Sequence, residues 1–547
     1  MERLMNRIVS DKANYDAAYR GHSWSLPAQL NMGAQIADEP VDRSYDAPAI
    51  IDGSSGEVLT FGQLSAMAAR LTGALMREGA KRGDRVAVIA PQGFSTAIVH
   101  AAILRAGLVG VPLSERYGRD ALEHRLNDSG ASFAFVSPSG RDKLNSIAGG
   151  LTSLKTVIDV DSEPASTTSL ETFIGDTASA AAVATTPDDP ALMIYTSGTT
   201  GPAKGALHGH RVLAGHMPGF SFAHGDRIAP DAVFYTPADW AWAGGLLNLL
   251  FPALSLGFPV VAYADPDGFD ATQTLETMRL RGVTHAFLPP TALKLMRAHA
   301  PAEALGESGL QSVMSAGEAL GRETFHWARE AFGFAIAEAY GQTEANLVIG
   351  SSVAHGAMRE GATGRPVPGH RVYVVREDGT ETEPGEVGEI AVGLPDPVAF
   401  LGYWQVEDAT RRKKRQSETL GALLMTGDMA MRDMDGFIWF VGRDDDVITS
   451  SGHRIGPGEI EDCLTSHPAV SMAAVIGVPD PVRTQIVRAF VVLRNGHRDD
   501  DAMARDLRAH VRANLAAHEY PREIRFVDRL PMTTTGKIIR RMLKGMD

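Results

Sequence analysis

The hydrophobic positions of this chain follow two alternating periods from about residue 59 onwards. Leu64, Leu71 and Leu75 recur on one face of a helix, and Thr60 stands where an N-cap residue is preferred. The apolar run at residues 85–90 has the composition of a β-strand, and residues 97–106 again have a helical pattern. The pattern therefore predicts a helix, a strand and a helix in succession.

The same alternation returns further along the chain. Short β-rich runs at residues 133–136, 260–262 and 285–288 are separated by segments long enough for helices. Strands that alternate with helices are typical of sheets in which the strands run parallel. We therefore expect an α/β fold: a large N-terminal domain of mainly parallel sheets.

The pattern changes near residues 384–389. Residues 389–393 and 437–441 indicate strands of a small β-rich section of the large domain. Beyond Arg443 the pattern predicts a helix at 457–466, strands at 471–478 and 487–493, a helix at 501–515 and a strand at 523–527. This last unit has about a hundred residues, a normal size for a separate domain. We expect two domains, residues 1–444 and residues 445–547, the second a small α+β domain.

Composition and charge exclude several classes of protein. The 547 residues carry a formal net charge of -14, whereas a nucleic-acid-binding protein normally presents a basic face. The single cysteine, Cys463, lies in an amphipathic segment and indicates a buried structural thiol rather than a nucleophile. The apolar stretch 244–256 is too short to cross a bilayer and contains Pro252. With no secretory signal visible, we expect a cytoplasmic protein without membrane insertion.

The most informative stretch, residues 195–205, follows a predicted strand. It contains Thr196, Ser197, Gly198, Thr199, Thr200, Gly201 and Lys204. Glycines allow backbone N–H groups to face an anion, hydroxyls add neutral donors, and a lysine adds a mobile charge. A polar surface loop is the alternative. The spacing of a Walker loop is not met, because Lys204 is followed by Gly205 rather than by Ser or Thr.

Further motifs stand at wide separations, at residues 315–320, 338–344, 425–428, 442–443 and 530–540. With these residues the chain resembles the adenylate-forming superfamily over nearly its whole length. That superfamily includes acyl-CoA synthetases, aryl-CoA ligases, luciferases and free-standing adenylation domains. The resemblance implies ATP and coenzyme A as cosubstrates and Mg²⁺ as cofactor.

The resemblance also assigns roles to individual residues. Tyr340 is expected to stack on adenine, Thr343 to contact the α-phosphate, and Glu344 to bind Mg²⁺, which prefers carboxylate and phosphate oxygens. Asp428 and Arg443 are expected to contact the ribose. The remaining nucleotide contacts implied by the resemblance are Gly317, Glu318, Ala319, Glu338, Ala339, Gly341 and Gln342.

In the C-terminal part, Lys537 resembles the catalytic lysine that neutralises charge during adenylation, and Arg454 the arginine that meets the phosphate of the adenylate. Asp445 falls at the family's hinge. Ser451, Gly452 and His453 fall where relatives line the coenzyme A tunnel, and Arg483 and Arg512 are candidates for its phosphates. A surface position is the alternative for both arginines.

The sequence indicates some residues of the acyl pocket. Acetate-specific relatives have a tryptophan where this chain has Gly341, so we expect an acid larger than acetate. Trp240 and Trp242 are expected to be pocket aromatics, with core packing as the alternative. Gly245 belongs to the same segment, and His210 is expected beside the pocket. The segment most resembles medium-chain acyl-CoA synthetases, whose acids are linear, branched or aromatic.

We therefore expect an enzyme that activates a small-molecule carboxylate with ATP and transfers the acyl group to coenzyme A. The main alternative is a stand-alone adenylation domain that loads a carrier protein. A luciferase-like oxygenase and a nucleotide-binding regulator without turnover are further alternatives. The sequence leaves the oligomeric state open, a homodimer included. The basic run at residues 411–415 is expected to be a solvated helix face.

Overall fold

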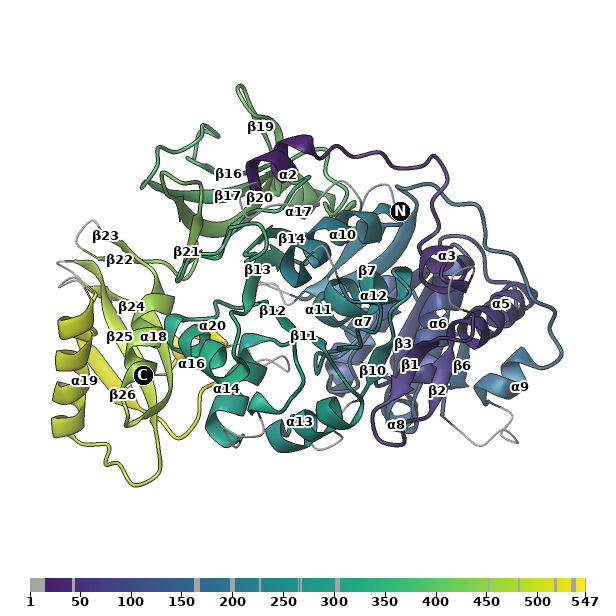
Figure 1. Ribbon diagram of the computed structural model, residues 1–547, viewed down its shortest axis with the longest axis horizontal. Coiled ribbons are helices and arrows are strands. Elements are labelled where there is room, and N and C mark those ends of the chain that lie inside the picture. Colours follow the sequence, from purple (N-terminus) through teal and green to yellow (C-terminus); the bar gives the residue numbers. More distant parts are fainter. Residues whose placement is uncertain are drawn as a thin grey trace.

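A computed structural model describes most of the chain. The described residues are 15–41, 45–161, 168–196, 202–225, 228–263, 265, 268–300, 305–450, 453–480, 483–515, 519–532 and 538–546. They form four sheets, arranged with their helices as Figure 1 shows. Within these residues, no helix has the length and apolar character needed to cross a membrane.

The largest sheet has nine strands, in the order β15-β14-β13-β12-β11-β9-β10-β1-β2. Their bounds are β1 Pro48–Asp52, β2 Val58–Thr60, β9 Phe234–Tyr235, β10 Val260–Ala262, β11 His285–Phe287, β12 Ser312–Ala316, β13 Ala337–Gln342, β14 Ala345–Gly350 and β15 Arg365–Pro366. The six neighbouring strands β13, β12, β11, β9, β10 and β1 pair in parallel. Strands β2, β14 and β15 add antiparallel edges. The expectation of mainly parallel sheets is confirmed.

The second sheet has seven strands, in the order β18-β8-β7-β4-β3-β5-β6. Their bounds are β3 Arg85–Ile89, β4 Val109–Pro112, β5 Phe133–Val136, β6 Thr156–Asp159, β7 Pro190–Thr196, β8 Lys204–Gly209 and β18 Gly402–Tyr403. The strands β7, β4, β3, β5 and β6 are parallel, whereas β8 and β18 add an antiparallel end beside β7. That end carries the glycine- and hydroxyl-rich loop predicted from the sequence.

Helices fill the space between these two sheets and cover their outer faces. The bounds are α2 Tyr15–Gly21, α3 Met32–Ala37, α5 Phe61–Arg77, α6 Phe94–Arg105, α7 Arg119–Ser129, α8 Pro138–Ile147, η1 Ala148–Gly150, α9 Leu170–Ile174, α10 Arg211–His224, α11 Ala243–Gly245, η2 Leu246–Leu250, α12 Phe251–Ser255, α13 Ala271–Leu280, α14 Pro290–His299, α16 Arg322–Phe332 and α17 Glu407–Arg412. Alternation along β3 shows the layering, because Val86 packs with α5 and α6 whereas Ala87 packs with α7 and α8.

The first helix predicted from the sequence is confirmed in detail. The Thr60 side chain accepts a hydrogen bond from the backbone N–H of Gln63, and the Gln63 side chain accepts one from the backbone N–H of Thr60. This capping box satisfies N–H groups that the first turn of a helix leaves without partners.

The β-rich section forms an antiparallel sheet in the order β16-β17-β20-β19, with β21 paired to β20. Its strands are β16 Val372–Val375, β17 Val387–Gly393, β19 Lys414–Ser417, β20 Gly421–Arg432 and β21 Ile438–Arg443. The long strand β20 brings this sheet next to β13, as the hydrogen bonds described below show. The section predicted from residue 384 onwards is therefore present.

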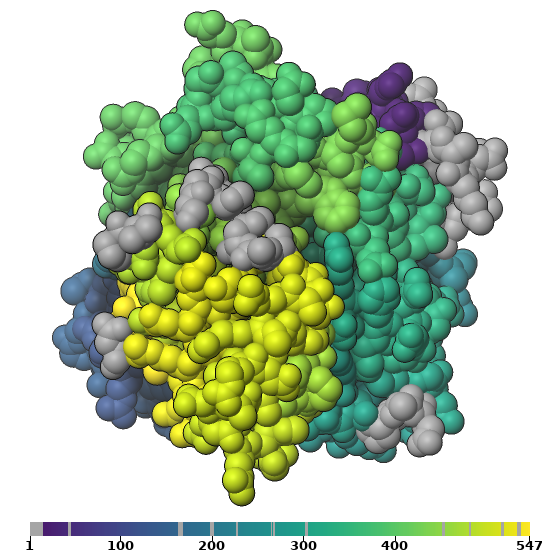
Figure 2. All heavy atoms as spheres, turned by 90° about the vertical axis from the view of Figure 1, so that its left-hand side faces the viewer, coloured from purple at the N-terminus to yellow at the C-terminus, as the bar shows by residue number. Residues whose placement is uncertain are grey.

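The C-terminal part has its own sheet, in the order β23-β22-β25-β24, with β26 paired to β25. Its elements are β22 Ile448–Ser450, β23 His453–Ile455, α18 Pro457–Ser466, β24 Val470–Asp480, β25 Thr484–Leu493, α19 Asp501–Asn514, β26 Glu523–Phe526 and α20 Arg540–Leu543. Helices α18 and α19 cover one face, where Cys463 is buried as predicted. Figure 2 shows this part (yellow) against the β-rich sheet (green) and the teal segments near residue 300.

Candidate active site

The glycine- and hydroxyl-rich loop joins two antiparallel strands. Thr196 ends β7 and stands opposite Lys204, the first residue of β8, so these two residues define the base of the loop. The predicted contacts Ser197, Gly198, Thr199, Thr200 and Gly201 lie outside the described residues. Lys204 Nζ lies 5.6 Å from the ring centre of Tyr403.

Glu344 contacts the same tyrosine. Thr343 and Glu344 form the turn between β13 and β14, and the Glu344 residue is only 7% exposed. The Tyr403 hydroxyl donates a hydrogen bond to Glu344 Oε1. Burial and the charge of Glu344 raise the pKa of Tyr403, so the phenol stays a donor. Lys204, Tyr403 and Glu344 thus form one cluster, which we call the carboxylate cluster.

A second cluster surrounds Asp428. The Tyr340 hydroxyl and the Gln342 amide both donate to Asp428 Oδ2, at 2.6 Å and 3.0 Å. Burial and the nearby charge of Asp428 raise the pKa of Tyr340 well above its ordinary value. Arg443 stands opposite Asp428 in the pairing of β21 with β20. Because both bonds go to Oδ2, they leave Asp428 Oδ1 unoccupied by these donors.

Lys413 belongs to this second cluster, although the sequence did not indicate it. Its Nζ donates to the Thr426 carbonyl at 2.7 Å and to Gln342 Oε1 at 3.2 Å. The expectation of a single helix face for residues 411–415 is wrong, because α17 ends at Arg412 and β19 begins at Lys414. At the turn between them, Lys413 points inward and holds the Gln342 side chain.

The predicted adenine segment follows β12. Gly317 has φ 102° and is exposed, and a Cβ built on it meets nothing within 4 Å, so this edge is open. Glu318 accepts from Thr291 at 3.4 Å, and Ala319 is exposed. Beneath this loop, Glu338 Oε1 accepts from the Leu320 backbone at 3.2 Å. Ala339 is buried and leads to Tyr340. The structure thus brings the loop beside β13.

The buried Glu338 is expected to make the stability of the protein depend on pH. Burial, with the charge of Asp462 adding to it, raises the pKa of Glu338 from 4.5 to about 7. The folded chain therefore keeps this proton at pH values where the unfolded chain releases it. The protonated Glu338 contributes to the free energy of unfolding at low pH, and this contribution is lost as the pH rises through about 7. We expect Glu338→Gln to raise the melting temperature by about 2–4 °C near pH 8. The gain is expected to vanish near pH 5.

Differential scanning fluorimetry from about pH 5 to pH 8 checks this expectation. Glu330→Gln, which changes an exposed carboxylate on the neighbouring α16, is the matched control. A gain from Glu338→Gln that is equal at every pH would contradict the raised pKa.

Gly341 is held by close packing. A Cβ at this position would lie 2.3 Å from the Leu347 backbone nitrogen and 2.6 Å from Asn346 Cα. A side chain there would therefore require β14 to move, which the sequence alone did not indicate. Beside it, the buried Asn346 amide donates to Asn248 Oδ1 at 2.6 Å, and Asn248 lies on the π-helical turn η2.

The other predicted acyl-pocket residues occupy different surroundings. Trp240 is 1% exposed and belongs to the core between the two large sheets. Trp242 is half-buried and packs edge-on against Tyr117, with ring centres 5.6 Å apart. Gly245 is buried, and a Cβ on it would lie 2.5 Å from the Asp239 carbonyl oxygen. His210 Nδ1 accepts from the Met32 backbone at 3.0 Å, which holds its ring against α3.

The predicted hinge lies between the β-rich sheet and the C-terminal part. Arg443 Nε donates to Asp445 Oδ1 at 3.3 Å, and Lys544 Nζ donates to the Asp445 carbonyl at 3.2 Å. Asp446 pairs with Arg540 of α20 at 3.5 Å. The side chains of the C-terminal part thus reach back to this junction.

The remaining C-terminal predictions are only partly described. Ser451, Gly452 and Lys537 lie outside the described residues, and His453 and Arg454 are placed as backbone of β23. The Arg483 backbone donates to Asp480 at 2.8 Å. The Arg512 guanidinium lies 4.8 Å from the Tyr520 ring centre.

This fold and these clusters correspond to a known class of protein. A family model described as AMP-binding enzyme matches residues 37–404, and one described as AMP-binding enzyme C-terminal domain matches residues 459–537. The chain therefore belongs to the AMP-binding enzyme family, and the resemblance to adenylate-forming enzymes is confirmed.

Individual relatives share most of the chain. It is 35% identical to the uncharacterized acyl-CoA ligase YtcI of Bacillus subtilis (strain 168), covering 86% of this chain and 87% of the relative. It is 30% identical to the mitochondrial acyl-coenzyme A synthetase ACSM3 of Rattus norvegicus, covering 98% and 94%. The crystal structure of the anthranilate CoA ligase AuaEII with anthranoyl-AMP has a TM-score of 0.86 and 26% identity, covering 95% of this chain and 98% of that one.

Proposed function

We propose that this chain is an AMP-forming acyl-CoA synthetase. A carboxylate oxygen attacks the α-phosphorus of ATP, the bond to the leaving phosphate oxygen breaks, and an acyl-adenylate and diphosphate result. The thiol of CoA then attacks the acyl carbon, loses its proton to solvent and displaces AMP. The observation that carries the proposal is that one hairpin, β13–β14, holds both the carboxylate cluster and the Asp428 cluster.

In this proposal the nucleotide lies along that hairpin. Tyr340 packs against adenine, and Asp428 and Arg443 receive the ribose hydroxyls. The open loop at Gly317, Glu318 and Ala319 covers the base. Lys413 supports these contacts by holding Gln342 in place. A ribose hydroxyl can donate to Asp428 Oδ1, because Tyr340 and Gln342 already occupy Oδ2.

The phosphates then lie at the loop that Thr196 and Lys204 delimit, beside Thr343 and Glu344. The Glu344 carboxylate suits Mg²⁺, because this ion is commonly held by one or two carboxylates together with substrate phosphates. When bound, Mg²⁺ neutralises phosphate charge. The chain's own groups, Lys204 and Lys537, add positive charge where it develops in the transition state. The contribution of the protein is positioning and charge rather than covalent catalysis.

We propose that the C-terminal domain, residues 445–547, moves between the two half-reactions. Lys537 serves adenylation. Thioester formation uses Arg454 and the segment Ser451–Gly452–His453. The CoA phosphates are bound by Arg483 and Arg512. Asp445 absorbs the rotation, because it joins β21 to the C-terminal sheet.

Asp445→Pro tests this movement, because proline fixes φ at the junction. We expect one half-reaction to stay within about three-fold of wild type and the other to fall by about ten-fold or more. Diphosphate exchange measures the first half-reaction, and CoA-dependent release of AMP from a preformed acyl-adenylate measures the second. Asp445→Ala is the control for loss of the side chain. Equal losses in both half-reactions would argue against a hinge.

The acid is proposed to be larger than acetate, and linear, branched or aromatic. Acetate-specific relatives carry a tryptophan at the position of Gly341, and the structural relative AuaEII is named as an anthranilate ligase. Loss of bulk here is expected to favour longer or flatter acyl groups. The cytoplasmic location and the oligomeric state, a homodimer included, stay predictions.

A panel of acids tests the function. Acetate, linear acids to decanoate, isobutyrate and benzoate are to be assayed for CoA-dependent AMP release. Turnover with CoA supports the proposal. Turnover only with a carrier protein favours the stand-alone adenylation domain. Absence of carboxylate-dependent diphosphate exchange across the panel would overturn the enzyme assignment in favour of a regulator.

A further inference from the structure

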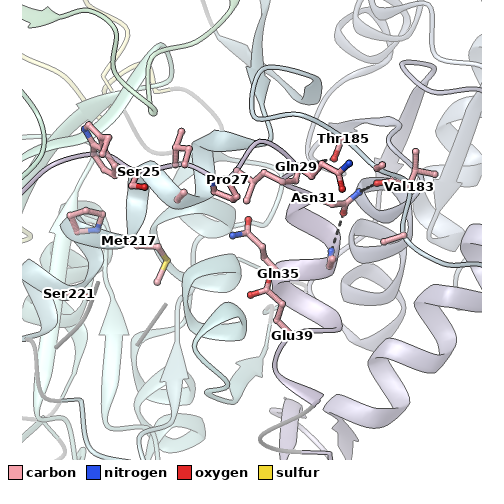
Figure 3. Close-up of a pocket in the computed structure, with 18 of the residues that line it drawn as sticks. Ser25, Pro27, Gln29, Asn31, Gln35, Glu39, Val183, Thr185, Met217 and Ser221 are labelled. Carbon is pink, nitrogen blue, oxygen red and sulfur yellow. Dashed lines mark hydrogen bonds between the residues drawn. The ribbon is translucent and has the colours of Figure 1, made fainter. Parts of the chain in front are cut away.

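A separate cavity of about 550 Å³ lies near the N-terminal end of the described chain, and Figure 3 shows it in close-up. Its outer wall is residues 22–31, which we call the strap. The other walls are α3, residues 182–185 and one face of α10. The volume falls in the range of small-molecule sites, which are usually clefts of about 300–1,000 Å³. None of its lining residues belongs to the proposed active site.

The strap is fixed at both ends, so the cavity is built into the fold. At one end, Trp24 Nε1 donates to the Gly369 carbonyl at 2.7 Å. At the other end, the Leu30 backbone donates to the Thr185 carbonyl at 2.8 Å and Thr185 Oγ1 donates back to Leu30 at 2.7 Å. Asn31 Nδ2 adds a bond to Val183 at 2.9 Å.

The walls are mainly apolar. Trp24, Leu26 and Leu30 face the cavity from the strap, and Met217 and Pro218 face it from α10. No lysine or arginine is among the described residues that line it. His22 also lines the cavity, and burial lowers the pKa of its imidazole, which favours the neutral form. A carboxylate or a phosphate would therefore find no cation among the described lining residues, which separates the ligand of this cavity from the acids and phosphates of the active site.

Two buried polar atoms of the cavity lining have no hydrogen-bond partner among the described residues: His22 Nε2 and one acceptor, on Gln35. Gln35 is 4% exposed, and its Oε1 has no hydrogen-bond partner among the described residues. Pro218, inside α10, has no N–H for the Ala214 carbonyl one turn earlier, and both residues line the cavity. Figure 3 shows Gln35 and Glu39 reaching in from the α3 side and Met217 facing the cavity from α10.

We propose that this cavity binds a small, mainly apolar molecule whose polar end is a hydrogen-bond donor without negative charge, a hydroxyl or a protonated amine. The apolar body lies against Trp24, Leu30 and Met217. The donor reaches Gln35 Oε1, which has no partner within the described part of the chain, and the exposed Glu39 adds attraction for a protonated amine. A donor on Gln35 Oε1 removes the cost of leaving this buried acceptor unpaired.

Calorimetric titration of the full chain with 1-hexanol, hexylamine and hexanoate tests the proposal. We expect the alcohol and the amine to bind with dissociation constants of about 1 mM or tighter. Met217→Trp fills the cavity and is expected to abolish this binding. Gln35→Leu is expected to weaken both ligands about ten-fold. Glu39→Gln is expected to weaken the amine several-fold and leave the alcohol unchanged.

Two controls keep the result specific. Met76→Trp adds the same indole at an exposed methionine of α5 and is expected to leave binding unchanged. Unaltered diphosphate exchange and melting temperature show that each variant is folded. Hexanoate, if it binds as a substrate, is expected to be insensitive to Met217→Trp. Binding of the alcohol and amine that survives Met217→Trp, their failure to bind, or hexanoate binding that Met217→Trp abolishes would each overturn the proposal.

Discussion

Lys537→Met is expected to reduce acyl-adenylate formation by about 10²–10³-fold, a typical effect of removing a group that stabilises transition-state charge. In the first half-reaction two anions approach each other, because a carboxylate attacks a phosphate. A positive group at that point lowers the barrier, and methionine keeps the length of the side chain without its charge. The second half-reaction releases AMP from a neutral acyl carbon and needs this charge less. We expect transfer from a preformed acyl-adenylate to CoA to stay within about five-fold of wild type.

The described residues on both sides of Lys537 are held by specific contacts. Met532 and Ile538 form an antiparallel bridge, which closes the loop at its base. Directly after it, Arg540 donates to both carboxylate oxygens of Glu461, at 2.8 Å and 2.7 Å. This half-buried pair anchors α20 to α18.

Diphosphate exchange and transfer from a preformed acyl-adenylate are to be measured on the same preparations. Lys155→Met, at an exposed position directly before β6, is the matched control and should behave like wild type. If Lys537→Met slowed both half-reactions equally, the lysine would not act chiefly in adenylation.

Glu344→Gln is expected to have the second-largest effect. It keeps the shape of the side chain and removes the negative charge that a magnesium–phosphate complex requires. We expect kcat/KM for ATP to fall by about 10²-fold and the Mg²⁺ concentration for half-maximal rate to rise several-fold. The 7% exposure of Glu344 means that water cannot easily replace the lost charge.

Tyr403→Phe is the matched comparison, because it removes only the hydrogen bond to Glu344 and leaves the carboxylate. Its expected loss is smaller, about three- to ten-fold, and the Mg²⁺ dependence should change little. A Mg²⁺ dependence unchanged in Glu344→Gln would move the metal site elsewhere.

The fold was largely predictable from the sequence, because its signals are local. The boundaries of β5, β10 and α18 agree with the predicted runs residue for residue. The alternation of strands with helices identified the parallel sheets, since helical and strand periods are readable within about ten residues. Tyr340, Glu344 and Asp428 were indicated by the resemblance to the adenylate-forming superfamily, and their roles stay predictions.

What could not be predicted depends on contacts between distant segments. Tyr403 meets Glu344 across 59 positions and Lys413 meets Gln342 across 71. A lysine in a basic run has the same local pattern whether it faces water or turns inward. The packing of Gly341 against β14 is likewise decided by a hairpin that only the folded sheet creates.

The strap has a mechanical consequence. Tyr19 donates to the His370 carbonyl at 3.1 Å and Trp24 to Gly369, next to the β-rich sheet, while Leu30 is bound to Thr185, close to β7. The N-terminal segment is therefore a brace between the sheet that carries Asp428 and the sheet that carries Lys204. Their spacing is set when the chain folds, so a nucleotide that bridges them meets a rigid frame and loses less affinity to ordering. In the proposed mechanism, rotation is expected of the chain beyond Arg443.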